Sequence, residues 1–231
     1  MRIAILSDIH GNLEALQAIG NSWDELWVLG DLVNYGPNPA EVVDFVRANA
    51  ATVVRGNHDH AIGHGTDPRC SPAFRQMAQT MQAYTQSVLS EEQKAYLRQL
   101  PAAARKKRDG KRFFLCHATP SDPLFHYGPQ EPAFWAREAA AVNTDILLVG
   151  HTHLPSILHM SPWQIVNPGS VGQPKHGRCE ASYAVWEDGK ITLKSQAYDV
   201  EKTVGRLLAL PIDEGIRNQL VEVLRNGSPP R

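Results

Sequence analysis

Cysteine is scarce in this sequence of 231 residues, which contains only Cys70, Cys116 and Cys179. An odd number of cysteines without Cys-x-x-Cys spacing predicts neither a disulfide framework nor a zinc ribbon. A chain of this kind suits a reducing compartment, so we expect it to be cytoplasmic.

Long hydrophobic runs are also missing. No apolar stretch approaches the roughly 18 residues that a transmembrane helix needs. The first residues, MRIAILSDIHGN, reach polar side chains at Ser7 and lack the apolar region and cleavage site of a signal peptide. We therefore expect no membrane partner.

An excess of charge of either sign is absent, because the formal net charge is -1. This balance gives no electrostatic footprint for DNA, RNA or an anionic membrane. The basic run from Arg105 to Arg108 precedes an Asp-Gly pair, and we interpret it as a solvated strand edge. A nucleic-acid partner is not expected. With 42% hydrophobic and 20% charged residues, the chain has the composition of a globular protein, and its length favours one domain over residues 1–231.

Six short apolar runs that end in Gly, Asp, Asn or His predict buried strands by their length and β-branched content. These runs are residues 2–8, 25–31, 51–57, 112–117, 145–151 and 164–169. Helical patterns follow the first two runs, and the pairs Asp109-Gly110 and Asp188-Gly189 predict hairpin turns. The alternation of strands and helices predicts a layered α/β domain with a mixed sheet.

Two further segments have helical character. Residues 66 to 104 are rich in Ala, Gln, Met and Arg and predict a small helical insertion of two helices. This insertion is either a cap beside the site or a packing hairpin without a role in substrate binding. A final helical segment is expected from about residue 200 to 224.

Five of the six strand-like runs end in side chains that can bind metal. In chain order these are Asp8 and His10, then Asp31, then Asn57, His58 and Asp59, then His117, and last His151 and His153. Ligands bind outside the carboxyl ends of strands in open α/β sheets, so these side chains should converge. Asp8 and His10, and likewise His151 and His153, are two residues apart, and residues i and i+2 of an extended strand end share a face. We interpret GNHDHA, residues 56 to 61, as a tight turn that forms one wall of this shared site.

Imidazole, carboxylate and amide ligands together suit borderline divalent metals such as Mn, Fe, Zn or Co. No thiolate is offered, which argues against a closed structural zinc site. The candidate ligands exceed what one ion needs, and a bridging aspartate would let two ions share them. Paired ions about 3.5–4 Å apart generate a hydroxide and clamp a phosphoryl group.

The motifs SDIHGN (7–12), GDLVNYG (30–36), GNHD (56–59), CHATP (116–120) and GHTH (150–153) occur in this order. With them, residues 1 to about 195 resemble the calcineurin-like metallophosphoesterase superfamily. The segment NPGSVG (167–172) is similar to one in its small bacterial, phosphodiesterase-type branch.

The resemblance implies a four-layer αββα sandwich with mixed central sheets, and it gives each matched residue a role. His58 would protonate the leaving oxygen or stabilise the transition state, and Asn12 would contact a phosphate oxygen. The metal ligands would be Asp8, His10 and His153 for a first ion, Asn57, His117 and His151 for a second, and Asp31 between them. The implied cofactor is a pair of divalent ions, with manganese preferred and iron, zinc, nickel, cobalt and magnesium as alternatives.

One departure from the family pattern bears on the substrate. Where the protein phosphatase and dinucleoside-tetraphosphatase relatives have Gly-Asp-x-x-Asp-Arg-Gly, this chain has Asn34 and Tyr35. Tyrosine cannot clamp phosphate as arginine does, although Arg55 or Arg178 could substitute. The resemblance thus implies hydrolysis of phosphodiester bonds of small molecules or nucleotides, by attack of a metal-bound hydroxide.

Two alternatives stay open. The chain could be a phosphomonoesterase acting on nucleotides or sugar phosphates, or a non-catalytic scaffold with the same fold. The remaining histidines are expected to be structural, with substrate contact left open for His60 and His64; the others are His126, His159 and His176.

Overall fold

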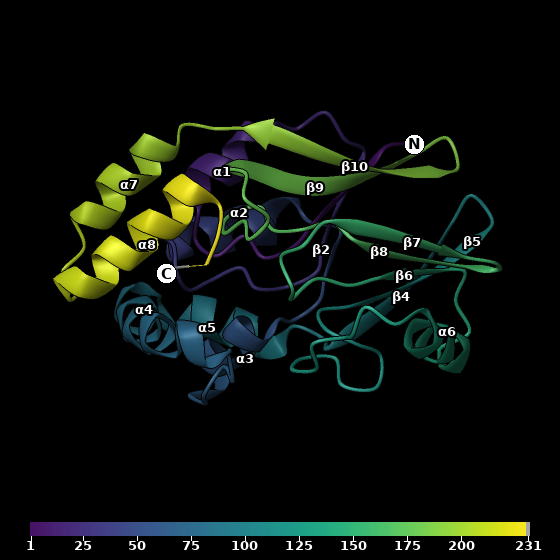
Figure 1. The fold of residues 1–231 in the computed structure, drawn as a ribbon, viewed down its shortest axis with the longest axis horizontal. Coiled ribbons are helices and arrows are strands. Elements are labelled where there is room, and N and C mark those ends of the chain that lie inside the picture. The colour runs from purple at the N-terminus through teal and green to yellow at the C-terminus, as the bar shows by residue number, and fades with distance from the viewer. Residues whose placement is uncertain (230–231) are drawn as a thin grey trace.

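Two mixed five-stranded sheets form the centre of the protein in the computed structural model, which describes residues 1–229 (Figure 1). The first sheet has the order β10 (Lys190–Ala197), β9 (Glu180–Glu187), β1 (Ile3–Leu6), β2 (Glu25–Val28) and β3 (Thr52–Val53). The second has the order β4 (Ala103–Arg108), β5 (Lys111–Cys116), β6 (Ile146–Leu148), β8 (Trp163–Asn167) and β7 (Ser156–Met160). All six strand-like runs therefore form strands.

Each sheet combines parallel and antiparallel pairs. The parallel strands are β1, β2 and β3 in the first sheet and β5, β6 and β8 in the second. The two Asp-Gly pairs turn the antiparallel hairpins β4–β5 and β9–β10, with Asp109 and Asp188 at positive φ, as predicted.

Alternation along the strands divides the core into layers. Ile3 and Ile5 of β1 point into the cluster between the two sheets, whereas Leu6 packs with helices on the outer face. Between the sheets, the Phe113 ring lies edge-on to that of Trp27, with centroids 5.3 Å apart. This aromatic layer covers the inner faces of the sheets, and helices cover the outer faces, which explains why the strands are apolar on both faces.

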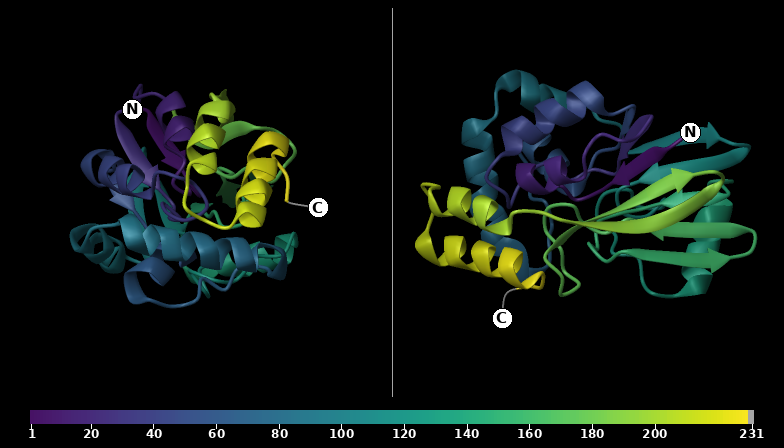
Figure 2. Two further views of the ribbon diagram at one scale, coloured as in Figure 1. Left: turned by 90° about the vertical axis from the view of Figure 1, so that its left-hand side faces the viewer. Right: turned by 90° about the horizontal axis from the view of Figure 1, so that it is seen from above.

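Helices cover both outer faces of the sheets. Side chains of α1 (Leu13–Ala18) and α2 (Pro39–Asn49) pack on the first sheet, and α6 (Pro132–Ala141) packs on the second (Figures 1 and 2). The predicted αββα sandwich is thus confirmed. Within residues 1–229, no helix is long and apolar enough to cross a membrane.

The remaining helices gather at one end of the molecule. They are α3 (Asn57–His64), a short 3-10 helix (Pro72–Phe74), α4 (Arg75–Val88), α5 (Glu91–Gln99), α7 (Val200–Leu208) and α8 (Glu214–Asn226). The expected final helical segment is two helices, because Pro211 interrupts it and Asp213 caps α8 by accepting from the Ile216 amide at 3.0 Å.

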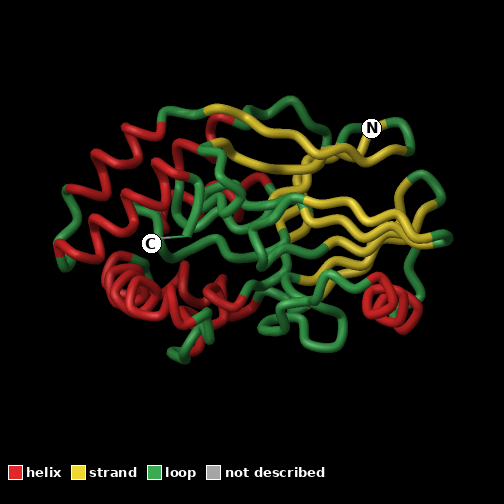
Figure 3. Tube along the Cα trace, in the orientation of Figure 1, coloured by secondary structure: helices red, strands yellow, loops and turns green. Residues whose placement is uncertain are grey.

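Figure 3 separates these parts in one view, with most strands on one side and most helices on the other. The loops that follow the parallel strands lie between them, and the candidate ligands are on these loops, except Asn57, which is the first residue of α3. The sheet ends thus present the ligands to a space that α3 and α4 border.

Candidate metal centre

The candidate ligands leave their strands through left-handed backbone. The φ angles are 53° at Asp8, 48° at His10, 55° at Asp31, 66° at His151 and 63° at His153. Few residues other than glycine adopt this conformation, although Asp and His do so more readily than most. The expectation that an extended strand end aligns residues i and i+2 is therefore wrong, because the backbone has turned before these positions. Such strained backbone concentrates at functional sites.

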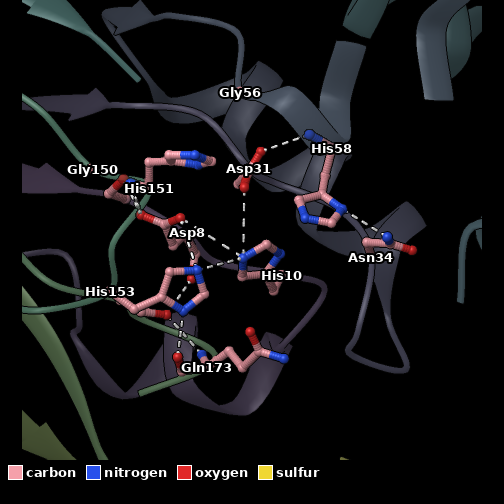
Figure 4. Close-up of polar contacts among 12 residues, drawn as sticks. Asp8, His10, Asp31, Asn34, Gly56, His58, Gly150, His151, His153 and Gln173 are labelled. Atoms are coloured by element: carbon pink, nitrogen blue, oxygen red, sulfur yellow. Dashed lines mark hydrogen bonds and ion pairs between the residues drawn. The ribbon is translucent and has the colours of Figure 1, made fainter. Parts of the chain in front are cut away.

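The first ligand cluster contains Asp8, His10 and His153, whose ligand atoms lie within 4.8 Å of one another (Figure 4). The Asp8 Oδ1 atom is 3.2 Å from His153 Nε2 and 3.8 Å from His10 Nε2. All three side chains are buried. The loops after β1 and β6, which belong to different sheets, meet here.

The second cluster contains Asp31, His117 and His151, again within 4.8 Å. The His117 Nε2 atom is 3.3 Å from Asp31 Oδ2 and 3.1 Å from His151 Nδ1. The Asn57 side chain joins the cluster, with its Oδ1 atom 3.0 Å from His117 Nε2. The structure thus brings together all seven residues that the sequence nominated as ligands.

Asp31 lies between the two clusters. Its Oδ2 atom is 3.7 Å from His10 Nε2 of the first cluster and 3.3 Å from His117 Nε2 of the second. The other carboxylate oxygen, Oδ1, accepts a hydrogen bond from the His58 amide at 2.9 Å. A Cβ atom at Gly56 would stand 2.0 Å from that oxygen, so only glycine allows this close approach.

Hydrogen bonds fix the tautomers of three histidines. The Nδ1 atoms of His10, His117 and His153 face the backbone carbonyls of Val33, Leu29 and Gln173 at 2.9, 2.9 and 2.6 Å. A carbonyl only accepts, so each Nδ1 donates, which leaves Nε2 of the neutral ring as the atom that can bind a metal ion. Metal-binding histidines use this arrangement.

These Nε2 atoms give a test of whether metal ions fit. The Nε2 atoms of His10 and His153 face each other at 3.2 Å, where two lone pairs repel unless a cation lies beside both. The Asp8 Oδ1 atom of the first cluster is buried without a hydrogen-bond partner. The donor set of imidazole, carboxylate and amide groups therefore fits two divalent ions.

Electrostatics set the protonation states of the ligands in the protein without metal. Burial lowers the pKa of His151 to about 3, so its imidazole is neutral at neutral pH. Burial also lowers the pKa of His117, but the Asp31 carboxylate outweighs it and raises that pKa to about 9. The same attraction holds the pKa of Asp31 well below its usual range. This carboxylate is thus ionised.

GNHDHA is the start of a helix and not the tight turn expected from the sequence. Gly56 is the N-cap of α3, and Asp59 at the third helical position accepts from the Gly56 amide at 3.0 Å. The Asp59 carboxylate also accepts from the amides of Asp31 and Leu32, each at 2.8 Å. Asp59 therefore positions Asp31 and is not a ligand. An acidic residue three positions after the N-cap is a sequence signal of a helix start, and Asp59 provided it here.

His58 stands beside the clusters with a neutral partner. Its Nδ1 atom is 2.8 Å from the Asn34 side-chain nitrogen, which also donates to the Ala78 carbonyl at 3.2 Å. Because Asn34 donates, His58 Nδ1 accepts and the proton of the ring is on Nε2. Burial lowers the pKa of His58 to about 4, so the ring is neutral at neutral pH. Ala78 belongs to α4, so the helical insertion borders the site.

Tyr35 stands where the phosphatase relatives have arginine. Its buried ring lies edge-on to the rings of His10 and His58, with centroids 4.9 Å from each. Neither expected substitute reaches the clusters: Arg55 donates to His64 and to the Arg98 carbonyl, and Arg178 is exposed beside a separate hollow.

The cation of the site is Lys175, which the sequence reasoning missed. It lines a small cavity together with Asp31 and His58, and its Nζ atom lies 4.3 Å from the centre of the Phe74 ring. Burial lowers the pKa of Lys175 to about 8, while the charges of Asp8 and Asp31 oppose this. Its one signal in the sequence was its place just after NPGSVG.

Asn12 has a structural role instead of the expected phosphate contact. It is the N-cap of α1, and its Oδ1 atom accepts from the Ala15 amide at 3.1 Å. Its Nδ2 atom donates to the Gly172 carbonyl at 3.0 Å and to the Tyr198 hydroxyl at 3.2 Å. These bonds leave no free donor for a substrate.

The other histidines lie outside the clusters. His60 and His64 stack on each other with ring centroids 4.5 Å apart, whereas His126 lines a large cavity next to the metal centre. Tyr127, which the sequence did not single out, stacks on His151 with centroids 3.9 Å apart.

Comparisons with known proteins identify the family of this chain. Residues 1–188 match the family described as the calcineurin-like phosphoesterase superfamily domain. A solved metallophosphoesterase structure from Sphaerobacter thermophilus has a TM-score of 0.82 and 32% identity, covering 98% of this chain and 99% of that one.

Two named relatives are similar over different shares of the chain. Phosphodiesterase YfcE from Escherichia coli (strain K12) is 29% identical over 213 residues, which are 84% of this chain and 91% of that protein. A symmetrical bis(5'-nucleosyl)-tetraphosphatase from Vibrio cholerae is 35% identical over 160 residues, 62% of this chain and 51% of that protein. From the family match over most of its length, the protein belongs to the calcineurin-like phosphoesterase superfamily, in its bacterial phosphodiesterase-type branch, and is a hydrolase of phosphoric esters.

Proposed function

We propose that this protein is a dinuclear metal-dependent phosphodiesterase acting on small-molecule or nucleotide substrates. The observation that carries the proposal is the position of Asp31, whose Oδ2 atom faces ligands of both clusters. Asp8, His10 and His153 would hold one ion and His117, His151 and Asn57 the other, with Asp31 shared. Manganese is the ion we expect.

Bound ions of this kind supply Lewis acidity and lower the pKa of water. The residues around them have separate tasks. As a neutral ring, His58 donates a hydrogen bond from Nε2 to the leaving oxygen, and Asn34 holds the ring in place. Lys175 attracts the single negative charge of a phosphodiester. Asp59 and Gly56 keep the Asp31 carboxylate between the clusters.

The proposed preference for diesters rests on charge. A monoester dianion carries more charge than a diester and gains most from the bidentate arginine clamp that Tyr35 replaces. Lys175 offers a point charge, which suits a monoanion. The similarity to a relative named phosphodiesterase over 84% of the chain supports the same choice.

The two alternatives are less well supported. A phosphomonoesterase acting on nucleotides or sugar phosphates would need a second cation near the clusters, and within residues 1–229 Lys175 is the one lysine or arginine that lines the small cavity. A non-catalytic scaffold would not need His58, which is present with a hydrogen-bonded partner.

A substrate panel tests the proposal. With Mn²⁺, Mg²⁺, Zn²⁺ or Ni²⁺ added, we expect kcat/KM for 4-nitrophenyl diesters to exceed that for 4-nitrophenyl phosphate, and metal-free protein to be inactive. Manganese should give the highest rates. A consistent preference for monoesters across several leaving groups would contradict the diester assignment, and activity that survives complete chelation would contradict the metal requirement.

Lys175 should contribute to substrate binding. We expect Lys175→Met to lower kcat/KM for a diester roughly 10- to 100-fold, the usual effect of losing one bond to a charged group. Lys175→Arg should retain most of the activity. The exposed Lys202 of α7 provides the control Lys202→Met, which should match the parent. An unchanged kcat/KM in Lys175→Met, at unchanged metal content, would remove Lys175 from the mechanism.

A further inference from the structure

A cavity of about 680 Å³ adjoins the metal centre, and the proposed function does not yet assign an occupant to it. One wall comes from the segment between β5 and α6, including Tyr127, and from Trp135 of α6 itself. The Trp135 indole is held by a hydrogen bond from Nε1 to the Pro129 carbonyl at 2.8 Å. This wall is therefore ordered and aromatic.

The opposite wall is the outer face of the second sheet. Ser156 pairs with Asn167, and Leu158 pairs with Ile165, so these four side chains share one face of β7 and β8. All four line the cavity. A planar group could thus lie between the sheet and the aromatic wall.

The lining carries almost no charge. Among the described residues that line the cavity there is no Asp, Glu or Arg, and the one amine is Lys175, at the side shared with the metal centre. The Asn167 amide is already used, because it donates to the Gly150 carbonyl at 2.7 Å and accepts from the Gly169 amide at 2.9 Å. The occupant is therefore an uncharged and largely apolar group.

The cavity borders the metal centre. It shares five lining residues with the small cavity beside the clusters: Ser71, Phe74, Tyr127, His151 and Lys175. A phosphate at the clusters thus lies beside these shared residues, and a group attached on this side extends past them toward the large cavity.

The position of the cavity relative to His58 decides which group enters it. The cavity borders His151 and not His58, and Figure 4 shows these two side chains on either side of Asp31. The leaving oxygen belongs on the His58 side. We infer that the cavity binds the organic group that stays on the phosphate after hydrolysis, and that this group is uncharged and aromatic. The inference rests on the proposed phosphodiesterase function and explains why a diester is preferred: a monoester has no such group.

Binding of slowly hydrolysed diesters tests the cavity separately from turnover. By calorimetry on Mn²⁺-loaded protein, diphenyl phosphate should bind roughly 10- to 100-fold more tightly than dimethyl phosphate, the gain for burying one aromatic ring. Ser156→Trp should narrow the space between the sheet and the aromatic wall and abolish this difference, and Ser156→Leu should reduce it. The control is Thr192→Trp on exposed β10, the edge strand of the other sheet. Equal affinities for the two esters in the parent would overturn the inference.

A pair of chromogenic substrates tests which group the cavity holds. Phenyl 4-nitrophenyl phosphate and methyl 4-nitrophenyl phosphate share a leaving group and differ only in the retained group. We expect a kcat/KM advantage of roughly 10-fold or more for the phenyl ester, lost in Ser156→Trp and kept in Thr192→Trp. Elemental analysis and circular dichroism of Ser156→Trp should match those of the parent, which would show that this variant is folded and loaded with metal.

The outcomes separate the two ideas. Hydrolysis of both esters with equal kcat/KM overturns the cavity assignment and leaves the phosphodiesterase function intact. Failure to hydrolyse either ester with any of the metals overturns the proposed function, whatever the calorimetry shows. If Ser156→Trp slows the methyl ester as much as the phenyl ester, the cavity assignment also fails.

Two kinds of alcohol supply such a group: nucleosides, which carry an aromatic base on a sugar, and aryl alcohols. Thymidine 5'-(4-nitrophenyl phosphate), assayed beside the phenyl ester, distinguishes these sources. A higher kcat/KM for the thymidine ester that Ser156→Trp removes would assign the cavity to a nucleoside. A lower one would assign it to a smaller aryl group.

Discussion

Replacing His58 by alanine should lower kcat by roughly 10²- to 10⁴-fold on a diester with a poor leaving group, the usual range for general acid–base catalysis. The Nε2 proton of His58 would no longer reach the leaving oxygen. Metal content should stay near that of the parent, because the seven ligand side chains are untouched. Steady-state rates and elemental analysis of the same preparation measure both quantities.

The dependence on the leaving group makes this prediction specific. The loss should shrink for nitrophenyl esters, whose leaving group hardly needs a proton. His60→Ala is a matched control, since His60 follows two residues later on α3 and stacks on His64 outside the clusters. Metal loss in His58→Ala as severe as in His117→Ala would show that His58 is a ligand. Unchanged activity on the poor leaving group would also refute its role.

Asp31→Asn should have the largest effect on metal binding. We expect the parent to take up two divalent ions per chain and the variant to bind at most one tightly. Affinity should fall by about 10²-fold or more, because losing even an outer partner of a metal ligand costs 10- to 100-fold. Hydrolysis of every ester should fall together. Metal titration followed by elemental analysis provides the measurement.

The hairpin residue Asp188 supplies a control for this variant. Asp188→Asn makes the same chemical change in an exposed turn, where Asn-Gly is as suitable as Asp-Gly. It should retain two ions and full activity. A parent that saturates at one ion, with Asp31→Asn unaffected, would contradict the two-ion arrangement.

Above neutral pH, substrate binding should change mainly because Lys175 loses its positive charge. Its pKa of about 8 is already lowered by burial, and the cation is present below that pH and lost above it. Near neutral pH His58 and His151 are neutral, since their pKa values lie at about 4 and about 3. Without metal, the neutral imidazoles of His58 and His151 thus lie beside the ionised carboxylate of Asp31. The His117 imidazole, whose pKa Asp31 raises to about 9, must lose a proton before it binds a cation.

The sequence by itself determined the strands and the chemistry at their ends. Short apolar runs must be buried on both faces, and the polar residues that end them must then lie at a sheet edge. This reasoning located Asp8, Asp31 and His117 without knowledge of the path of the loops. The order of the motifs carried the family resemblance, which a family match over residues 1–188 confirms.

The sequence pattern did not reveal the backbone conformation at the strand ends. The left-handed φ angles at Asp8 and His151 are held by tertiary contacts, such as the hydrogen bond from the His151 amide to Asp8 Oδ2 at 3.1 Å. The reading of GNHDHA as a turn failed for a similar reason. A single turn and the first turn of a helix begin alike, and α3 continues because it packs against α5.

Only the tertiary structure decided which residues outside the motifs complete the site. Lys175 and Tyr127 are far from the ligands in sequence and carry no periodic signal, yet the fold places both beside His151. The cavity likewise arises where α6 meets the face of β7 and β8 that bears Ser156. Apolar periodicity specifies which face of an element is buried, whereas the volume left between two such faces depends on how the whole layers pack.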